Sequence, residues 1–157
     1  MGKASSRACT LLFRLLALAA TATATIVMAT SHEKTTFFNI QIEAKFQHTP
    51  AFKFFAIANA IGALYSLIIL FVPPVTSYSR LVLASDMVIT MLLTAAVAAA
   101  GAVGQVGKKG NEHAGWLPIC GQIPKFCDQV MGSLICGFIA VLVYLVLLFH
   151  TIHTHTS

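Results

Sequence analysis

Charged residues are scarce in this chain, and their scarcity excludes an ordinary soluble domain. Asp, Glu, Lys and Arg make up 10% of the 157 residues, whereas a soluble domain of average composition carries about 25%. Hydrophobic residues make up 57%, and the mean hydropathy is +0.83. The composition indicates a small integral membrane protein, and we expect residues 1–157 to form one membrane domain.

A concentrated basic surface is also missing. The formal net charge of +5 is spread over the termini and the loops, whereas a nucleic-acid-binding domain gathers Lys and Arg on one face or along one helix. We therefore expect no nucleic-acid partner. A milder attraction to anionic lipid or to a cell-wall polymer fits the charge better.

The motifs of common catalytic sites are absent from the sequence as well. It contains no phosphate-binding glycine loop, no set of residues with zinc-ligand spacing and no paired nucleophile and base. His150, His153 and His155 could bind a metal, but a solvated chain terminus is the simpler interpretation. We expect a protein that is not an enzyme and that uses no cofactor and no metal.

Four apolar segments are long enough to cross a bilayer, which takes about 20 residues of helix. Pro73 and Pro74 end the second segment, because neither residue can donate a backbone hydrogen bond. The short link that follows makes the second and third segments antiparallel neighbours. We expect an all-α membrane fold, a four-helix antiparallel bundle with outside loops at 31–49 and 104–129. The predicted spans are Leu11–Thr30, Pro50–Val72, Leu81–Val103 and Val130–His150.

The first span has a second interpretation as a cleavable signal peptide. Lys3 and Arg7 precede an apolar run that reaches Ala22-Thr23-Ala24, which is the general pattern of such a leader. Arg14 interrupts the run, and the run is long for a leader. We therefore expect the segment to be retained as a membrane span.

Two cysteines in the last loop bear on the orientation. Cys120 and Cys127 lie seven residues apart, a spacing that permits a loop-closing disulfide, although both could remain thiols. A disulfide persists only on the oxidising side of the membrane. Basic residues before the first span favour a cytoplasmic N-terminus, whereas the lysines of the loops argue against it. We predict that both termini lie in the cytoplasm.

Arg14 and Asp86 are ionisable residues inside predicted spans. Such residues usually face the interior of a bundle and pair with one another. At 1.5 Å per residue, they lie at similar depths, close to those of Tyr65 and Tyr144 in the second and fourth spans. One interpretation is a structural ion pair with a polar layer of tyrosines. The other is a proton or ion relay, which needs polar groups through the whole membrane thickness. We favour the structural interpretation.

Small residues recur at four-residue steps in two spans, a pattern that lets helix backbones approach closely. The surfaces could pack within one bundle or between copies, and they exceed what one four-helix core needs. We therefore expect a homodimer or a larger homo-oligomer. The helix-packing positions are Ala58, Gly62 and Ser66 in the second span, and Gly132, Cys136 and Ala140 in the fourth.

The first outside loop contains one β signal. Apolar Phe38, Ile40, Ile42, Ala44 and Phe46 alternate with polar residues, the period of a strand. A lone strand is not stable in water. Its partner is either its own return, the second loop or another subunit.

The ordered set of motifs resembles the CASP-like proteins of plants, relatives of the Casparian strip membrane domain proteins. The resemblance covers nearly the whole chain from Arg7 to Phe149. It rests on Leu12–Ala17 in the first span, Pro50–Phe55 with Ala58–Ile61 in the second, Asp86 in the third, and Trp116, Cys120 and Phe126-Cys127 in the last loop.

The resemblance implies a MARVEL-related tetraspan that forms homo-oligomers, and hetero-oligomers with related tetraspans, in the plasma membrane. It also implies that Arg14, Asp86 and the Cys120–Cys127 pair are characteristic family positions. The founding members form immobile platforms that guide local cell-wall modification. Residues 31–49 lack their acidic, proline- and phenylalanine-containing segment, so we expect a general scaffold with cell-wall-modifying clients. A channel or transporter subunit that uses the polar layer is the alternative, and claudin-like adhesion is a weaker one.

Overall fold

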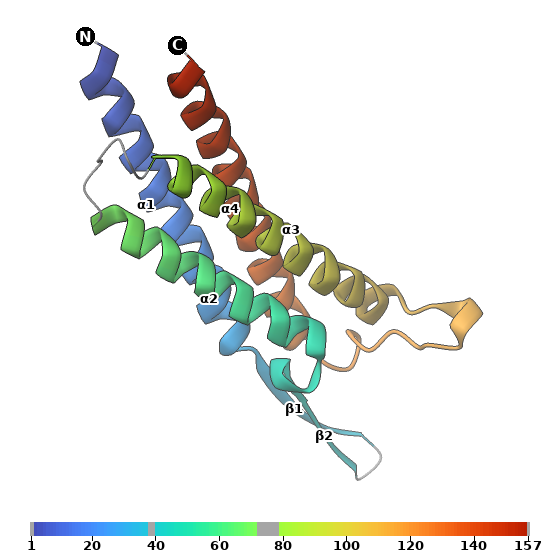
Figure 1. Cartoon of the computed structure of the whole chain (residues 1–157). Helices are drawn as coiled ribbons and strands as arrows, with labels where there is room; N and C mark the ends of the chain where they lie inside the picture. Colours follow the sequence, from blue (N-terminus) through green and yellow to red (C-terminus); the bar gives the residue numbers. More distant parts are fainter. Residues whose placement is uncertain (1, 38–39, 72–78, 157) are drawn as a thin grey trace.

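The computed structural model describes residues 2–37, 40–71 and 79–156. In this part of the chain, four long helices alternate in direction (Figure 1), and each is long and apolar enough to cross a membrane. The predicted all-α four-helix antiparallel bundle is confirmed. The helices are α1 (Gly2–Ala29), α2 (Pro50–Phe71), α3 (Ser79–Lys109) and α4 (Pro124–Thr156).

The helices extend beyond the predicted spans at the start of α1 and at both ends of α3 and α4. Helix α1 begins at Gly2, α3 continues to Lys109, and α4 begins at Pro124. The sequence criterion measured apolar length, whereas a helix continues into water as long as its backbone bonds are made. Pro124 suits the first position of a helix, where a missing N–H costs nothing. Residues 110–123 connect α3 and α4. The predicted end of the second span at Val72 lies outside the described residues.

Threonine hydroxyls in α1 are satisfied within the helix itself. Thr21, Thr23 and Thr25 each donate to the carbonyl four residues earlier, at 2.8, 2.8 and 2.9 Å. An unpaired hydroxyl in an apolar medium costs several kcal/mol, about 4–8 by transfer to cyclohexane. The intrahelical bonds remove that cost, so a threonine-rich segment can still form a membrane span.

The predicted strand in the first loop is confirmed as β2 (Ile40–Lys45), and its partner is β1 (His32–Phe37), the preceding part of the same loop. The two strands are antiparallel, and the register pairs His32 with Lys45. The prediction was wrong at Phe46, which begins the short helix η1 (Phe46–His48) that leads into α2. Phe38 lies outside the described residues.

The second loop closes on itself by backbone bonds. Asn111 N–H donates to the Trp116 carbonyl at 2.8 Å, on either side of the short helix η3 (Glu112–Ala114). Gly110 has a φ of +70°, and a Cβ there would lie 2.6 Å from the Trp116 carbonyl oxygen, so this position requires glycine.

The four helices form a ring in which α1 and α3 each pack against α2 and α4. Helices α1 and α3 are thus diagonal partners, and so are α2 and α4. The hairpin and the second loop project from one end of the bundle, which we call the hairpin end. Both chain termini lie at the other end, the terminal end (Figure 1).

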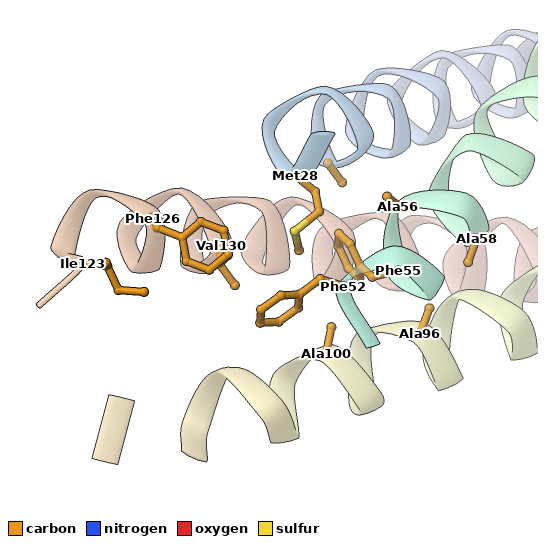
Figure 2. Close-up of a cluster of buried hydrophobic side chains, with 11 residues drawn as sticks. Met28, Phe52, Phe55, Ala56, Ala58, Ala96, Ala100, Ile123, Phe126 and Val130 are labelled. Carbon is orange, nitrogen blue, oxygen red and sulfur yellow. The ribbon is translucent and has the colours of Figure 1, made fainter. Parts of the chain in front are cut away.

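The core has two apolar clusters. Figure 2 shows the cluster near the hairpin end, where the Phe52 and Phe55 side chains of α2 lie between α3 and α4. The second cluster includes Ala17, Leu93 and Tyr144. Large apolar side chains also cover the outer surface, among them Leu64, Ile68 and Phe138. An apolar outer surface around a packed core is the pattern of a helix bundle in lipid.

Candidate functional site

A buried ion pair crosses the bundle from α1 to α3. The Arg14 guanidinium donates from Nη1 to Oδ1 of Asp86 and from Nη2 to Oδ2, both at 2.6 Å. The two side chains are 5% and 0% exposed. A bidentate pair of this kind fixes orientation as well as distance. Because α1 and α3 are diagonal partners, the pair spans the centre of the ring.

Tyr65 of α2 completes the coordination of the Asp86 carboxylate. Its hydroxyl donates to Oδ1 at 2.8 Å and lies 3.2 Å from the Val82 carbonyl oxygen on α3. The Arg14 guanidinium carbon lies 5.6 Å from the centre of the Tyr65 ring, within range of a cation–π interaction. One tyrosine therefore contacts both members of the ion pair.

Tyr144 of α4 joins the other diagonal. Its hydroxyl donates to the Gly62 carbonyl oxygen of α2 at 3.0 Å and lies 2.6 Å from the Ser66 hydroxyl. Because the Tyr144 hydroxyl proton is used in the bond to the Gly62 carbonyl, the Ser66 hydroxyl donates to the Tyr144 oxygen. The Tyr144 side chain is fully buried. The structure thus brings the four residues of the predicted polar layer together, and the layer links both pairs of opposite helices.

Polar side chains nearer the hairpin end bond to their own helices. The hydroxyls of Thr21, Thr90 and Ser133 donate to backbone carbonyls three or four residues away, and Asn59 donates to the Phe55 carbonyl at 2.9 Å. Within residues 2–37, 40–71 and 79–156, these bonds form no continuous chain from the Arg14–Asp86 pair to the hairpin end. The arrangement suits a static connection better than proton transfer across the membrane.

The predicted packing positions of α2 all lie inside the bundle. Ala58 and Ser66 are each 1% exposed, and a Cβ on Gly62 would lie 3.4 Å from side-chain atoms of Leu93 and Thr21. Close helix contact within one chain therefore accounts for this set of small residues.

The predicted packing positions of α4 divide between two faces. Ala140 is fully buried, and Cys136 is a half-buried free thiol. Gly132 is half-buried, and a Cβ there would meet nothing within 4 Å.

Sequence reasoning missed Gly137, where a Cβ would lie 2.7 Å from ring atoms of Phe55. A heptad pattern on α4 could have found it. The buried positions that follow this spacing are Val130, Ser133, Gly137, Ala140, Tyr144 and Leu147.

Two further bonds hold the hairpin end together. Cys120 and Cys127 form a disulfide with a Cα–Cα distance of 5.7 Å, which confirms the disulfide and not the free thiols. The Glu33 carboxylate of β1 accepts from the Phe126 backbone N–H in the first turn of α4, at 2.9 Å. No sequence signal pointed to this second bond. Trp116 is 59% exposed on the loop surface.

The family description "Casparian strip membrane protein domain" matches residues 3–143. This chain belongs to the CASP-like family. It is 57% identical to "CASP-like protein 1C2" of Vitis vinifera, over 98% of this chain and 96% of the relative. It is 56% identical to "CASP-like protein 1C2" of Populus trichocarpa, over 94% and 91%, and 50% identical to "CASP-like protein 1C1" of Arabidopsis thaliana, over 98% and 93%. No solved structure matches the chain.

The family assignment confirms the resemblance that the sequence motifs carried. Arg14, Tyr65, Asp86 and both bridged cysteines of this CASP-like protein fall within the matched range. The CASP-like family is one of membrane proteins, in agreement with the four apolar spans of the structure.

Proposed function

We propose that this CASP-like protein is a non-enzymatic scaffold of the plasma membrane. In this proposal, the four-helix unit oligomerises with itself and with related tetraspans into a platform that recruits cell-wall-modifying clients. The observation that carries the proposal is the bidentate Arg14–Asp86 pair with its two tyrosines. Its polar groups bind one another across both diagonals, which suits a rigid building unit.

The proposed orientation has the hairpin end outside the cell and both termini in the cytoplasm. The Cys120–Cys127 disulfide at the hairpin end supports this orientation, because disulfides persist in oxidising surroundings. Lys3 and Arg7 at the start of α1 are also typical of a cytoplasmic terminus.

Small residues on the outside of the bundle support self-association. Gly101 and Gly132 are positions where a Cβ would meet nothing within 4 Å in the single chain, and Ala98 and Ala102 of α3 are exposed. Helices associate in lipid through such small-residue surfaces, since they allow close van der Waals contact. A second copy of the chain can approach there without displacing any side chain.

Single-molecule tracking of the tagged protein at native abundance tests the scaffold. We expect immobile clusters in the plasma membrane, and we expect Gly132→Leu to disperse them because the added side chain blocks close approach. Ile135→Leu is the matched control, since Ile135 is already bulky and exposed on α4. Freely diffusing single molecules of the unmodified protein would contradict the proposal.

Proteoliposome flux measurements test the channel or transporter alternative with the same protein. A scaffold gives vesicles that leak no faster than empty ones. If the protein conducts ions or protons and Asp86→Asn abolishes this flux, the result would favour a channel or transporter over a scaffold, because Asp86 is the buried carboxylate at the centre of the layer.

A further inference from the structure

A cleft at the hairpin end lies apart from the polar layer. It opens between the C-terminal end of α3 and the N-terminal end of α4, with η1 and the disulfide loop beside it, and its volume is about 290 Å³. Its deeper surface is apolar and includes Phe52, Val103, Ile123, Phe126 and Val130. Figure 2 shows four of these side chains, Phe52, Ile123, Phe126 and Val130, near the outer ends of the helices.

The charged and titratable residues that line the cleft are basic, and the Glu33 carboxylate lies beside it, bound to the Phe126 backbone N–H. Lys45, His48 and Lys108 are among the residues that line it, and none of the described residues that line it is acidic. Apolar walls with a basic contribution are complementary to a molecule that has a long apolar part and an anionic end. Pockets with a few polar groups on apolar walls are the usual form of small-molecule sites.

The location fits an amphiphile that enters from the membrane. Lys108 lies next to the end of the apolar span of α3, and Ile123 lies next to the start of the span of α4. The cleft therefore lies where the candidate spans of α3 and α4 end toward the hairpin end. A ligand could place its chain against Phe126 and Val130 and keep its charged end near Lys108.

We propose that this cleft binds a long-chain fatty acid, with the acyl chain between α3 and α4 and the carboxylate near Lys108. The volume of about 290 Å³ lies just below the range of about 300–1,000 Å³ for small-molecule pockets, which favours one chain over the two chains of a phospholipid. The proposal does not depend on the scaffold function, since it uses no residue of the polar layer.

Photolabelling of the full-length protein in phosphatidylcholine nanodiscs tests the site. The probe is palmitic acid that carries a diazirine near the chain end and a terminal alkyne. We expect labelled peptides from residues 123–134 and competition by unlabelled palmitate. The methyl ester of the probe should label these peptides far less, because it lacks the anionic end.

Two variants with matched controls define the contacts. Lys108→Glu should reduce the labelling about fivefold, the ratio that corresponds to about 1 kcal/mol for an exposed charge pair, whereas Lys109→Glu on the neighbouring residue outside the cleft should not. Gly107→Leu should block the cleft, because a Cβ there already lies 3.7 Å from Ile119. Ala95→Leu adds bulk at an exposed position of α3 outside the cleft and should leave the labelling unchanged.

The results of these labelling experiments distinguish a fatty acid from a phospholipid as the ligand of the cleft. Equal labelling in the Lys108 and Lys109 variants, or equal labelling by the acid and its methyl ester, would overturn the proposal. Competition by phosphatidylglycerol but not by palmitate would assign the cleft to a membrane phospholipid and would also overturn it. If Gly107→Leu lowers the melting temperature, the Lys108 pair of variants still decides the matter.

Discussion

Asp86 is the residue on which most of the polar layer converges. Its carboxylate accepts two bonds from Arg14 and one from Tyr65, and it is fully buried. A buried ion pair adds little net stability to the fold, whereas the removal of one partner lowers the stability strongly. Removal of one member of a buried pair costs about 3–5 kcal/mol, because the other charge stays buried without a partner.

Neutralisation of Asp86 is expected to destabilise the fold. Asp86→Asn should lower the free energy of unfolding by about 3–5 kcal/mol and reduce accumulation, as measured by thermal unfolding in detergent and by protein level. The double exchange Arg14→Asp with Asp86→Arg should recover part of the loss. Glu112→Gln, at an exposed loop position, is the control and should have no effect. A double exchange that is no more stable than the single variants would contradict direct pairing.

The two tyrosines should respond differently when they are combined with a change at Asp86. Tyr65→Phe and Tyr144→Phe should each cost about 1–3 kcal/mol, since each leaves buried acceptors unpaired. The Tyr65 loss should shrink in the Asp86→Asn background, because its hydroxyl binds that carboxylate. The Tyr144 loss should stay the same to within about 0.5 kcal/mol, as expected for groups with no shared bond. A double-mutant cycle with additive losses for Tyr65 would contradict this arrangement.

At the scale of single elements, α4 shows how a helix can carry two different surfaces. The buried positions follow a heptad and include Gly137, whose missing side chain leaves room for the Phe55 ring. Gly132 lies one residue away from the buried Ser133 and faces open space in the single chain. The same residue type therefore serves the interior at one position and remains available to a second chain at the other.

Alanine substitutions should separate these two surfaces. Gly137→Ala should lower the free energy of unfolding by about 1–3 kcal/mol through overpacking, because the new methyl group would lie 2.7 Å from the Phe55 ring. Gly132→Ala meets nothing, and the higher helix propensity of alanine should make it neutral or slightly stabilising. Chemical unfolding of the detergent-solubilised protein measures both values. Equal destabilisation by the two substitutions would contradict the packing described for α4.

The elements also show what sequence reasoning can and cannot reach. Apolar length predicted four spans, and depth along each helix put Arg14 and Asp86 at a common level. Depth carries no information on which helices are neighbours, so the diagonal course of the pair could not be predicted. The four-step rule selected Gly132 and missed Gly137, because both positions satisfy small-residue spacing and only the packing of Phe55 distinguishes them. The Glu33–Phe126 bond joins segments far apart in sequence, and no local pattern encodes such a contact.

At the scale of the whole molecule, the orientation proposed above can be measured directly. Leu117 is 82% exposed on the second loop, so Leu117→Cys should react with a membrane-impermeant maleimide on intact cells. A C-terminal epitope should become accessible to antibody only after permeabilisation. Cys9→Ser is combined with the substitution to remove the thiol near the terminal end. Labelling of the epitope, and not of Leu117→Cys, on intact cells would reverse the orientation.

The ion pair between α1 and α3 and the hydrogen bonds between α2 and α4 lie at one depth in the bundle. They determine how the bundle responds to its bilayer. A helix that slid past its neighbours by one turn would separate Arg14 from Asp86 or Tyr144 from Gly62, so shear between helices is strongly resisted. A bilayer thinner or thicker than the apolar spans must then be accommodated by tilt of the entire subunit or by deformation of the surrounding lipid. The protein would impose its own thickness on the membrane around it.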